Sequence, residues 1–345
     1  MSKSYRQLVA LGFAVALGAA ASSQAHHSQS QFNLDPAAIE TISGTVTQYV
    51  FKNPHAYLML ETTQADGSTA LWELEASSTP NLVRRGWRAD SVEVGEELTI
   101  DIHPAKVPGQ HIARIGTIYL ADGGTLAVRG EGGIPRIVDQ RARATSLAGR
   151  RLGQWGLLQV QVDLDQWPLT PKGREAQANF DILQNPQVDC VPVASPTFML
   201  YSNIFDVTVA EDTIRVQGEW LDVERIIYLD GRAHPPASER SLQGHSIGHW
   251  EGAALIVDTA NYEAHGVGNA FQIPSGVRKH LLERLALSDD GKRIEYEFEL
   301  EDPEYLTEVV TGTTTWDYRP DLVPHRVECD PVNARRFLQR MLPRE

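Results

Sequence analysis

The stretch "RIEYEFEL", from Arg293 to Leu300, alternates strictly between charged and apolar residues. Successive side chains of a β-strand point to opposite faces of the sheet, so the four apolar residues share one face and the charged residues share the other. The apolar residues are Ile294, Tyr296, Phe298 and Leu300. One buried face and one wet face are typical of an antiparallel sheet, so the stretch predicts such a sheet around a core.

Segments with similar patterns lie on both sides of this stretch. The strands predicted for the second half span 205–210, 212–221, 224–230, 246–251, 254–262, 280–288, 293–302 and 308–318. Eight sequential antiparallel strands can close into an up-and-down barrel that leaves room for one small ligand. We therefore expect a lipocalin-like, antiparallel eight-stranded barrel over 164–345, with a two-sheet sandwich as the alternative. A short helix is predicted near the start of this domain, with Thr170 as its cap and Pro171 in its first turn.

The first half is also rich in strand patterns. Its five predicted strands span 41–53, 56–62, 70–76, 97–103 and 111–120. After the third strand, Thr79 suits a helix cap, Pro80 a first helical turn and Gly86 a helix end. Five strands with one short helix predict an OB-like small barrel over 26–127, followed by a linker or irregular segment over 128–163. The chain is thus predicted to be mainly β, with two β-domains.

The first 25 residues have the pattern of a signal peptide. Lys3 and Arg6 precede an apolar run, and Ser23-Gln24-Ala25 forms a small-residue cleavage site. The run is shorter than the ~20 apolar residues that span a bilayer. We therefore expect cleavage after Ala25 and a periplasmic or secreted protein without a transmembrane segment.

The composition excludes several classes of function. The chain has 31 basic and 45 acidic residues, a net charge of −14, which repels nucleic acid and anionic membrane surfaces. No glycine-rich phosphate loop follows a strand, and there is no Cys-x-x-Cys pair. Nucleotide cofactors and thiol redox chemistry are therefore not expected.

The two cysteines, Cys190 and Cys329, form an even number in a chain predicted to be exported. Oxidising compartments favour disulfides, so we expect a bond between them, with two unpaired buried thiols as the alternative. The bond would close a long loop and restrict the unfolded chain by about 4–5 kcal/mol in the chain-entropy model.

Several motifs resemble those of an uncharacterised family of secreted bacterial proteins. The first half carries Ala-His-His-Ser after the signal, Asn53-Pro54-His55, Trp72-x-Glu-x-Glu and Arg85-Gly86-Trp87. The second half carries "IIYLDGRAHP" (226–235), "GHSIGHWEG" (244–252), "VDT" (257–259), "LLER" (281–284) and "EDPEY" (301–305). The resemblance implies export and a β-domain joined to a strand-rich domain, and it implies no particular reaction.

The histidines of the first half are candidate metal ligands. Cleavage after Ala25 would free the amine of His26, and this amine and its imidazole could together chelate copper(II). A third nitrogen would come from His55, His103 or His111. In the alternative, the polar segment after the signal is a mobile arm, and His55 hydrogen-bonds the turn that it follows.

The densest polar cluster of the second half surrounds "GHSIGHWEG". Asp230, His234, His245 and Glu251 are its candidate acid–base residues. On a strand, His245 and Glu251 share a side, and a lumen on that side would shift their pKa values towards acid–base use. In one alternative Trp250 faces inward and the histidines lie on the surface. In another, Arg232 braces Asp230 or Glu251 in a structural network.

Two further features concern the lumen. Glu283 lies on the face of a leucine stripe, where it would be carried into the barrel unless it forms a salt bridge at the barrel edge. The residues available to contact a ligand are Trp220, Tyr228, Trp250, Phe298 and Trp316, together with Arg232 and Glu283.

The first functional hypothesis is therefore a barrel that encloses a small, largely apolar molecule. It would hold this molecule or perform isomerase, lyase or hydratase chemistry on it. The second hypothesis is a protein that binds copper or another divalent metal through His26, and the third is a non-catalytic interaction module of the cell envelope.

Overall fold

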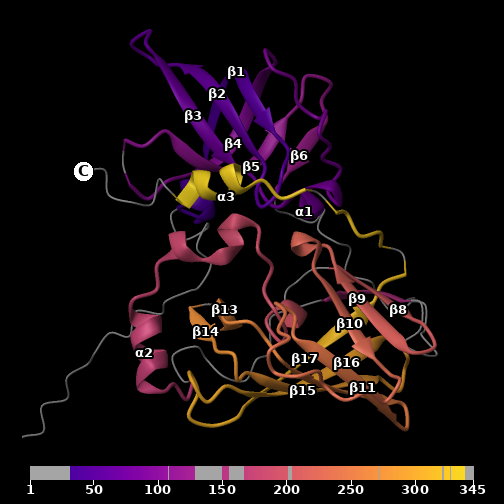
Figure 1. Ribbon diagram of the computed structural model, residues 1–345. Helices are drawn as coiled ribbons and strands as arrows, with labels where there is room; N and C mark the ends of the chain where they lie inside the picture. Colours follow the sequence, from indigo (N-terminus) through magenta and orange to yellow (C-terminus); the bar gives the residue numbers. More distant parts are fainter. Residues whose placement is uncertain are drawn as a thin grey trace, which may run out of the picture.

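The computed structural model describes residues 32–107, 109–128, 150–154, 167–200, 204–270, 272–320, 322–326 and 328–338. The predicted signal peptide, His26 and most of the segment 128–163 lie outside these ranges. The chain is mainly β, as predicted, and forms two β units, one above the other in Figure 1. None of the helices in the described ranges is long and apolar enough to cross a bilayer.

The first unit is a closed five-stranded barrel with one added strand. Its strands are β1 (Glu40–Val50), β2 (Tyr57–Thr63), β3 (Thr69–Glu75), β4 (Glu97–Pro104), β5 (Ile112–Tyr119) and β6 (Thr125–Ala127), after a short 3-10 turn η1 (Pro36–Ala38). The order is β3-β2-β1-β4-β5-β6, and a parallel pairing of β3 with β5 closes the ring. The helix α1 (Thr79–Val83) follows β3. The predicted OB-like barrel is confirmed.

The helix α1 begins at Thr79 itself, one residue earlier than a cap at that position implies. The Thr79 amide and hydroxyl both donate to Asn53 Oδ1, at 3.2 and 2.9 Å, so Asn53 anchors the helix to the segment between β1 and β2. After the helix, Trp87 is fully buried in the barrel core and its indole N–H donates to the Ala127 carbonyl at 3.1 Å.

The second unit is a strongly curled sheet. Its strands are β7 (Arg150–Gln154), β8 (Ile204–Val209), β9 (Thr213–Gly218), β10 (Glu224–Tyr228), β11 (His245–Glu251), β12 (Ala254–Ala260), β15 (His280–Leu287), β16 (Arg293–Glu301) and β17 (Val310–Tyr318). Antiparallel pairings join them from β11 through β12, β15, β16, β17, β7, β8 and β9 to β10. A short parallel pairing of β10 with β11 closes the ring. The predicted β-barrel is thus confirmed.

Its connections differ from an up-and-down meander in two ways. The segment 229–244 crosses over instead of making a hairpin, which is why β10 and β11 run parallel. The strand β7 lies within 128–163, the range predicted to be a linker, and it pairs with both β8 and β17. A separate hairpin of β13 (His265–Ala270) and β14 (Ile273–Ser275) is not part of the ring.

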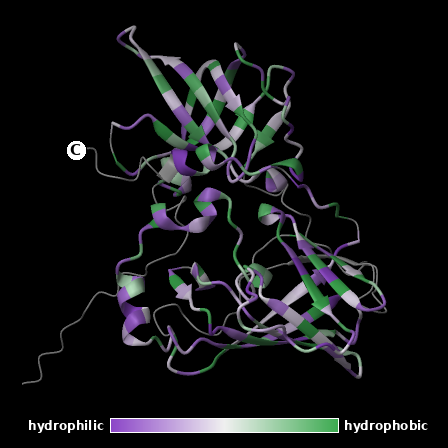
Figure 2. Ribbon diagram, viewed as in Figure 1, coloured by the Kyte–Doolittle hydropathy of each residue, from purple (hydrophilic) through white to green (hydrophobic). Residues whose placement is uncertain are grey.

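The concave face of the curled sheet holds the core. In β16, the apolar residues from Ile294 to Leu300 are buried and the charged residues between them are exposed, as the alternation predicts. Figure 2 shows the same interleaving of hydrophobic and hydrophilic residues along strands of both units. Phe298 and Trp316 belong to this core together with residues of the segment 193–200, which includes the 3-10 turn η5 (Phe198–Leu200). The Trp316 indole N–H donates to the Met199 carbonyl at 3.1 Å, and both of these predicted wall residues are buried in the protein's own core.

The chain after β7 also contains several short helices. They are α2 (Pro171–Ala178), η3 (Ile182–Gln184), η4 (Pro186–Asp189), η6 (Trp220–Asp222) and α3 (Pro331–Leu338). The predicted start of α2 is confirmed, because the Thr170 hydroxyl accepts a hydrogen bond from the Gly173 amide at 3.1 Å and Pro171 is the first helical residue.

The residues from Cys329 to the end of α3, here called the C-terminal strap, return to the first unit (Figure 1). The predicted disulfide joins Cys329 to Cys190, with an S–S length of 2.05 Å. The Asn333 side-chain amide donates to the His55 carbonyl at 2.8 Å, and the Arg336 guanidinium lies 2.9 Å from a Glu73 carboxylate oxygen on β3. The strap therefore ties the second unit to the outer face of the first barrel.

A buried ion pair also connects the units. Arg84, just after α1, donates to both carboxylate oxygens of Glu219, at 3.0 and 2.5 Å. Both side chains are largely buried, 7% and 2% exposed, so the pair is shielded from water. It holds the turn between β9 and η6 of the second unit against the helix of the first barrel.

Candidate functional site

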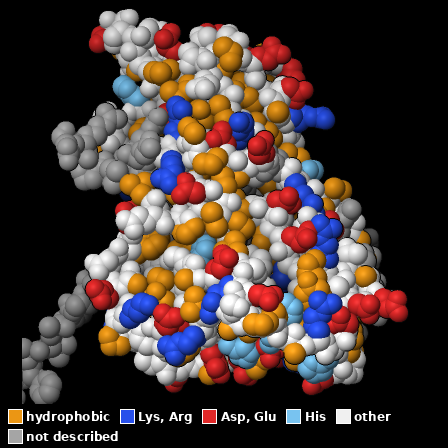
Figure 3. All heavy atoms as spheres, viewed as in Figure 1, with side chains coloured by type: hydrophobic (Ala, Val, Ile, Leu, Met, Phe, Trp, Pro, Cys, Tyr) orange, Lys and Arg blue, Asp and Glu red, His pale blue; other side chains and the backbone are white. Residues whose placement is uncertain are grey.

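A chain of hydrogen-bonded polar side chains lies on the outer face of the curled sheet. The strands β11, β12 and β15 are neighbours, and Ser246 and Thr259 are buried on the inner side. Side chains alternate along a strand, so His245 and Asp258 point outward. The crossover segment 229–244 brings His234 over the same face. Figure 3 shows histidine side chains, in pale blue, gathered at the lower edge of this unit among charged groups.

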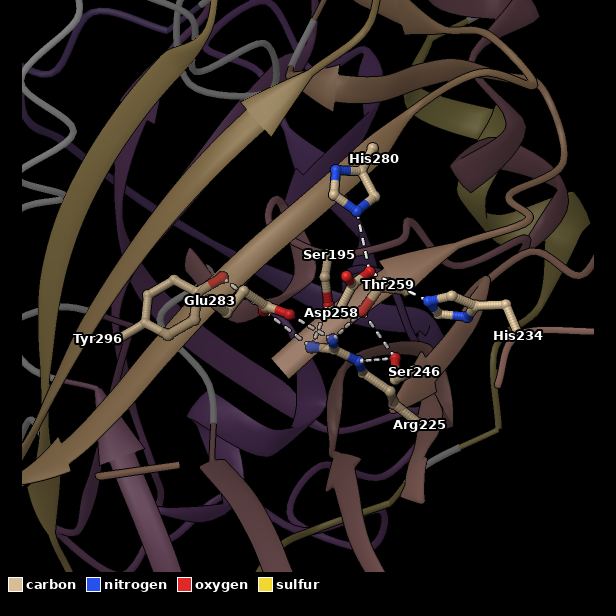
Figure 4. Close-up of polar contacts among 9 residues, drawn as sticks. All are labelled: Ser195, Arg225, His234, Ser246, Asp258, Thr259, His280, Glu283 and Tyr296. Carbon is tan, nitrogen blue, oxygen red and sulfur yellow. Dashed lines mark hydrogen bonds and ion pairs between the residues drawn. The ribbon is translucent and has the colours of Figure 1, made fainter. Parts of the chain in front are cut away.

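Three contacts connect the members of the chain, and Figure 4 shows two of them. His245 Nδ1 lies 3.0 Å from His234 Nδ1, and His234 Nε2 lies 3.1 Å from Asp258 Oδ1. His280 Nε2, from the first residue of β15, lies 2.9 Å from the same Asp258 oxygen. The order is therefore His245, His234, Asp258, His280.

The contacts determine where the protons lie. A carboxylate only accepts hydrogen bonds, so the Nε2 atoms of His234 and His280 are both donors to Asp258. Neutral His234 then has a bare Nδ1, which accepts the Nδ1 proton of His245. Assigned in this way from the hydrogen-bond network, neutral His245 keeps its lone pair on Nε2.

The surroundings of His245 keep its imidazole neutral. Burial lowers the pKa of His245 below its ordinary value, and the positive charge of Arg232, together with that of His234 when it is protonated, lowers it further, against the opposing effects of Asp230 and Glu239. The imidazole stacks on the Tyr228 ring, with centroids 5.1 Å apart and planes 19° apart. A neutral, stacked imidazole with an open Nε2 is suited to accept a proton.

A surface hollow of about 580 Å³ lies beside this imidazole. Its walls are residues of β10 and of the segment 235–245, and His245 and Tyr228 are among them. The Gln243 side-chain amide donates to the Val193 carbonyl at 2.9 Å, which holds this wall against the core. The end of the hydrogen-bonded chain thus faces a space that could hold a small molecule.

Directly beneath, on the inner side of the sheet, lies a second polar network. The Arg225 guanidinium forms a two-pronged pair with the Glu283 carboxylate, and 1% and 0% of the two side chains are exposed. The Tyr296 hydroxyl donates to Glu283 at 2.8 Å (Figure 4). The same guanidinium also donates to the hydroxyls of Ser195 at 3.0 Å, Ser246 at 3.0 Å and Thr259 at 2.8 Å. Glu283 is therefore an interior residue with an arginine partner, and the predicted edge salt bridge is not what the sheet forms.

Other predicted site residues lie apart from this chain. Glu251, at the far end of β11, pairs with His249 at 3.2 Å, and both side chains are mostly exposed. Asp230 pairs with Arg232, whose hydrogen bond lowers the pKa of Asp230 to about 2. Trp250 is 44% exposed at the strand end. The predicted set therefore divides, and only His234 and His245 lie in the outer chain.

The remaining predicted contact residues have partners of their own. The Trp220 indole N–H donates to the Gln187 side chain at 3.3 Å. The Arg232 guanidinium lies 3.9 Å above the Tyr228 ring, which places it in the stack that includes His245.

Asp258 and His280 are site residues that the sequence analysis missed. Asp258 lies in the "VDT" motif, and its face follows from the hairpin between β11 and β12. A tight turn after Glu251 places Ile247 opposite Asp258, on the same side as His245. Extending the two-residue period across this turn would have found Asp258.

The candidate metal ligands of the first unit lie in separate places. His55 Nδ1 lies 2.6 Å from the Glu75 carboxylate, and His103 Nδ1 lies 3.3 Å from the Asn33 carbonyl. The His111 ring packs on Trp72, with centroids 5.1 Å apart. Over the described ranges, which exclude His26, no three His, Cys, Asp or Glu side chains gather in a manner that could hold a metal ion.

Lys279, just before β15, is a buried amine in the same unit. Its Nζ donates to the Gly268 carbonyl at 2.6 Å and lies 4.6 Å from the Tyr262 ring centroid. Burial lowers the pKa of Lys279 to about 7, although Asp302 and Glu283 oppose the effect. The folded protein therefore binds a proton at this amine less readily than the unfolded chain does.

We expect this amine to make the free energy of unfolding rise with pH. Between about pH 7 and pH 10 the unfolded chain binds more protons at Lys279, so stability rises by up to about 1.4 kcal/mol per pH unit and is lost as the pH falls. Urea denaturation of wild type and Lys279→Met at pH 7, 8 and 9 measures it, and the variant should lack this part of the slope. Lys172→Met, at an exposed partner of Glu304, should keep it. Equal slopes for wild type and Lys279→Met would contradict the expectation.

The comparisons with known proteins concern mainly the first unit. Residues 14–112 match the model of a family of unknown function, DUF6152. Neither a curated protein nor a solved structure matches the chain. The matched range includes the strands from β1 to β4 and the helix α1, whereas the hydrogen-bonded chain and its hollow lie outside it.

Proposed function

We propose that this protein binds a small molecule in the hollow beside His245 and catalyses proton transfer on it. The observation that carries the proposal is the contiguous chain from Asp258 through His234 to His245, which ends at the wall of that hollow. An imidazole whose second nitrogen is held by an oriented partner is the usual arrangement of a general base.

The proposed chemistry is proton abstraction and return. His245 Nε2 takes a proton from a carbon beside a carbonyl or similar group, and the imidazolium that forms donates its Nδ1 proton towards His234. Asp258 stabilises the resulting positive charge through His234. Return of the proton to a neighbouring carbon completes an isomerisation, and its delivery to a leaving group completes an elimination. Tyr228, stacked on His245, keeps the imidazole plane fixed and offers an apolar surface to the bound molecule.

The proposed setting is the periplasm or the extracellular space. Two observations support it: the charged start, apolar run and small-residue site of the first 25 residues, and the Cys190–Cys329 disulfide. A small molecule with an apolar part and a polar reacting group fits this hollow, because its lining mixes Tyr228 and Pro235 with the polar Gln243 and with charged residues such as Glu239 and Arg240.

Hydrogen–deuterium exchange tests the proposal without knowledge of the product. A panel of small ketones, enones and keto esters is incubated with the protein in D₂O, and ¹H NMR follows loss of the signal beside each carbonyl. We expect enhanced exchange of at least one panel member, and a loss of about 100-fold or more with His245→Gln.

The matched control is His249→Gln, on the same face of β11 but paired with Glu251 at the exposed strand end. It should exchange the substrate at the wild-type rate. Equal rates for the two variants, or a panel that the wild type leaves unchanged, would count against acid–base catalysis by His245.

A further inference from the structure

One carboxylate oxygen serves two histidines. Asp258 Oδ1 accepts from His234 Nε2 at 3.1 Å and from His280 Nε2 at 2.9 Å, and only His234 continues to His245. His280 comes from a different strand, and its side chain is 34% exposed. It is therefore the member of the hydrogen-bonded chain that is farthest from His245, and solvent reaches its imidazole.

We propose that His280 is a positioning residue that sets the proton affinity of His245 through their shared partner Asp258. The inference rests on the proposed function, whose base it regulates. A protonated His280, on β15, donates a charge-assisted hydrogen bond to Asp258 and offsets the negative charge of its carboxylate. The carboxylate then stabilises a protonated pair of His234 and His245 less well.

A neutral His280 has the opposite effect. It still donates a hydrogen bond to Asp258, but the full negative charge of the carboxylate acts on His234. The proton affinity of His245 therefore increases as His280 loses its proton. In this way His280 tunes the base at the hollow, although two hydrogen-bonded partners separate it from His245.

Several other charged groups face the same chain. Arg232 and Asp230 approach His245 from the crossover segment, and Glu239 approaches it from the wall of the hollow. Glu301 of β16 stands opposite His280 in the sheet. Lys279, next to His280 in sequence, points into the core, so its amine is on the other side of the sheet. A test must therefore change His280 alone and read the titration of His245.

Long-range ¹H–¹⁵N NMR of the imidazoles, from pH 5 to pH 8.5, provides this reading. In His280→Phe, the titration midpoint of His245 should rise by about half a pH unit, because both the hydrogen bond to Asp258 and the competing charge are removed. His280→Gln keeps an N–H donor without a titrating charge and should give a smaller rise. Asp258→Asn removes the anion and should lower the midpoint, whereas His249→Gln should leave it unchanged.

A His245 midpoint that is the same in wild type, His280→Phe and His280→Gln would overturn the proposal. A midpoint that Asp258→Asn leaves unchanged would overturn it as well. The backbone amide spectrum of each sample shows whether the variant is folded. If His280→Phe does not fold, His280→Gln is the milder substitution and carries the test. The exchange assay separates the two proposals. If the midpoints shift but no panel member exchanges, the coupling between His280 and His245 is supported and the proposed function is contradicted. If a panel member exchanges but the midpoints do not shift, the proposed function is supported and the coupling is contradicted.

Discussion

Replacing Glu283 with alanine is expected to lower the free energy of unfolding of the second unit by about 3–5 kcal/mol. The change leaves the Arg225 guanidinium, which is 1% exposed, inside the curled sheet without its carboxylate. A buried charge without a partner bears the full cost of its removal from water. Urea denaturation followed by tryptophan fluorescence measures the loss, since Trp316 lies in the same core.

Two further variants sharpen this prediction. The double variant Arg225→Met/Glu283→Leu removes both charges and fills the space, so it should recover much of the stability lost in Glu283→Ala. Glu297→Ala, at an exposed residue 3.6 Å from Arg284, should cost less than about 1 kcal/mol. A loss in Glu283→Ala as small as that in Glu297→Ala would show that the interior pair is not shielded from water.

Removal of the disulfide is expected to have an effect at least as large. The bond joins residues 139 positions apart, and loss of a loop of this length releases about 5 kcal/mol of chain entropy in the unfolded state. The double variant Cys190→Ala/Cys329→Ala should therefore be destabilised by about that amount, as measured by denaturation under non-reducing conditions.

The wild-type protein reduced with dithiothreitol is the matched comparison and should denature together with the double variant. Limited proteolysis adds a local reading, because cleavage within the C-terminal strap should precede cleavage of the barrels once the bond is gone. A double variant as stable as the oxidised wild type would contradict the entropy argument and show that the contacts of Asn333 and Arg336 suffice.

Local patterns predicted the strands and much of the fold class. The alternation from Ile294 to Leu300 determines which face of β16 is buried, because each side chain depends only on the two-residue period. Thr170 and Pro171 mark the start of α2 for a similarly local reason, since the cap and the first turn lie within four residues.

The remaining features depend on contacts between distant segments. The parallel pairing of β10 with β11 is decided by the path of the crossover 229–244, and the pairing of β7 with β17 joins residues more than 160 positions apart. The hydrogen-bonded chain depends both on local sequence patterns and on the pairing of distant strands. Two of its members, His234 and His245, stood out as a polar cluster, whereas His280 joins them only because β15 pairs with β12.

The C-terminal strap makes the first barrel depend on a segment that is synthesised long after its own strands. Ribosomes complete the strands from β1 to β6 early, yet Glu73 on their outer surface receives its Arg336 partner only after some 260 further residues. Cys190 likewise forms its disulfide only after Cys329 has been synthesised. A chain cut short before the strap would lack the Arg336 partner of Glu73 on one unit and would carry Cys190 as a thiol on the other. Incomplete copies therefore differ from the finished protein in groups that the strap covers or bonds.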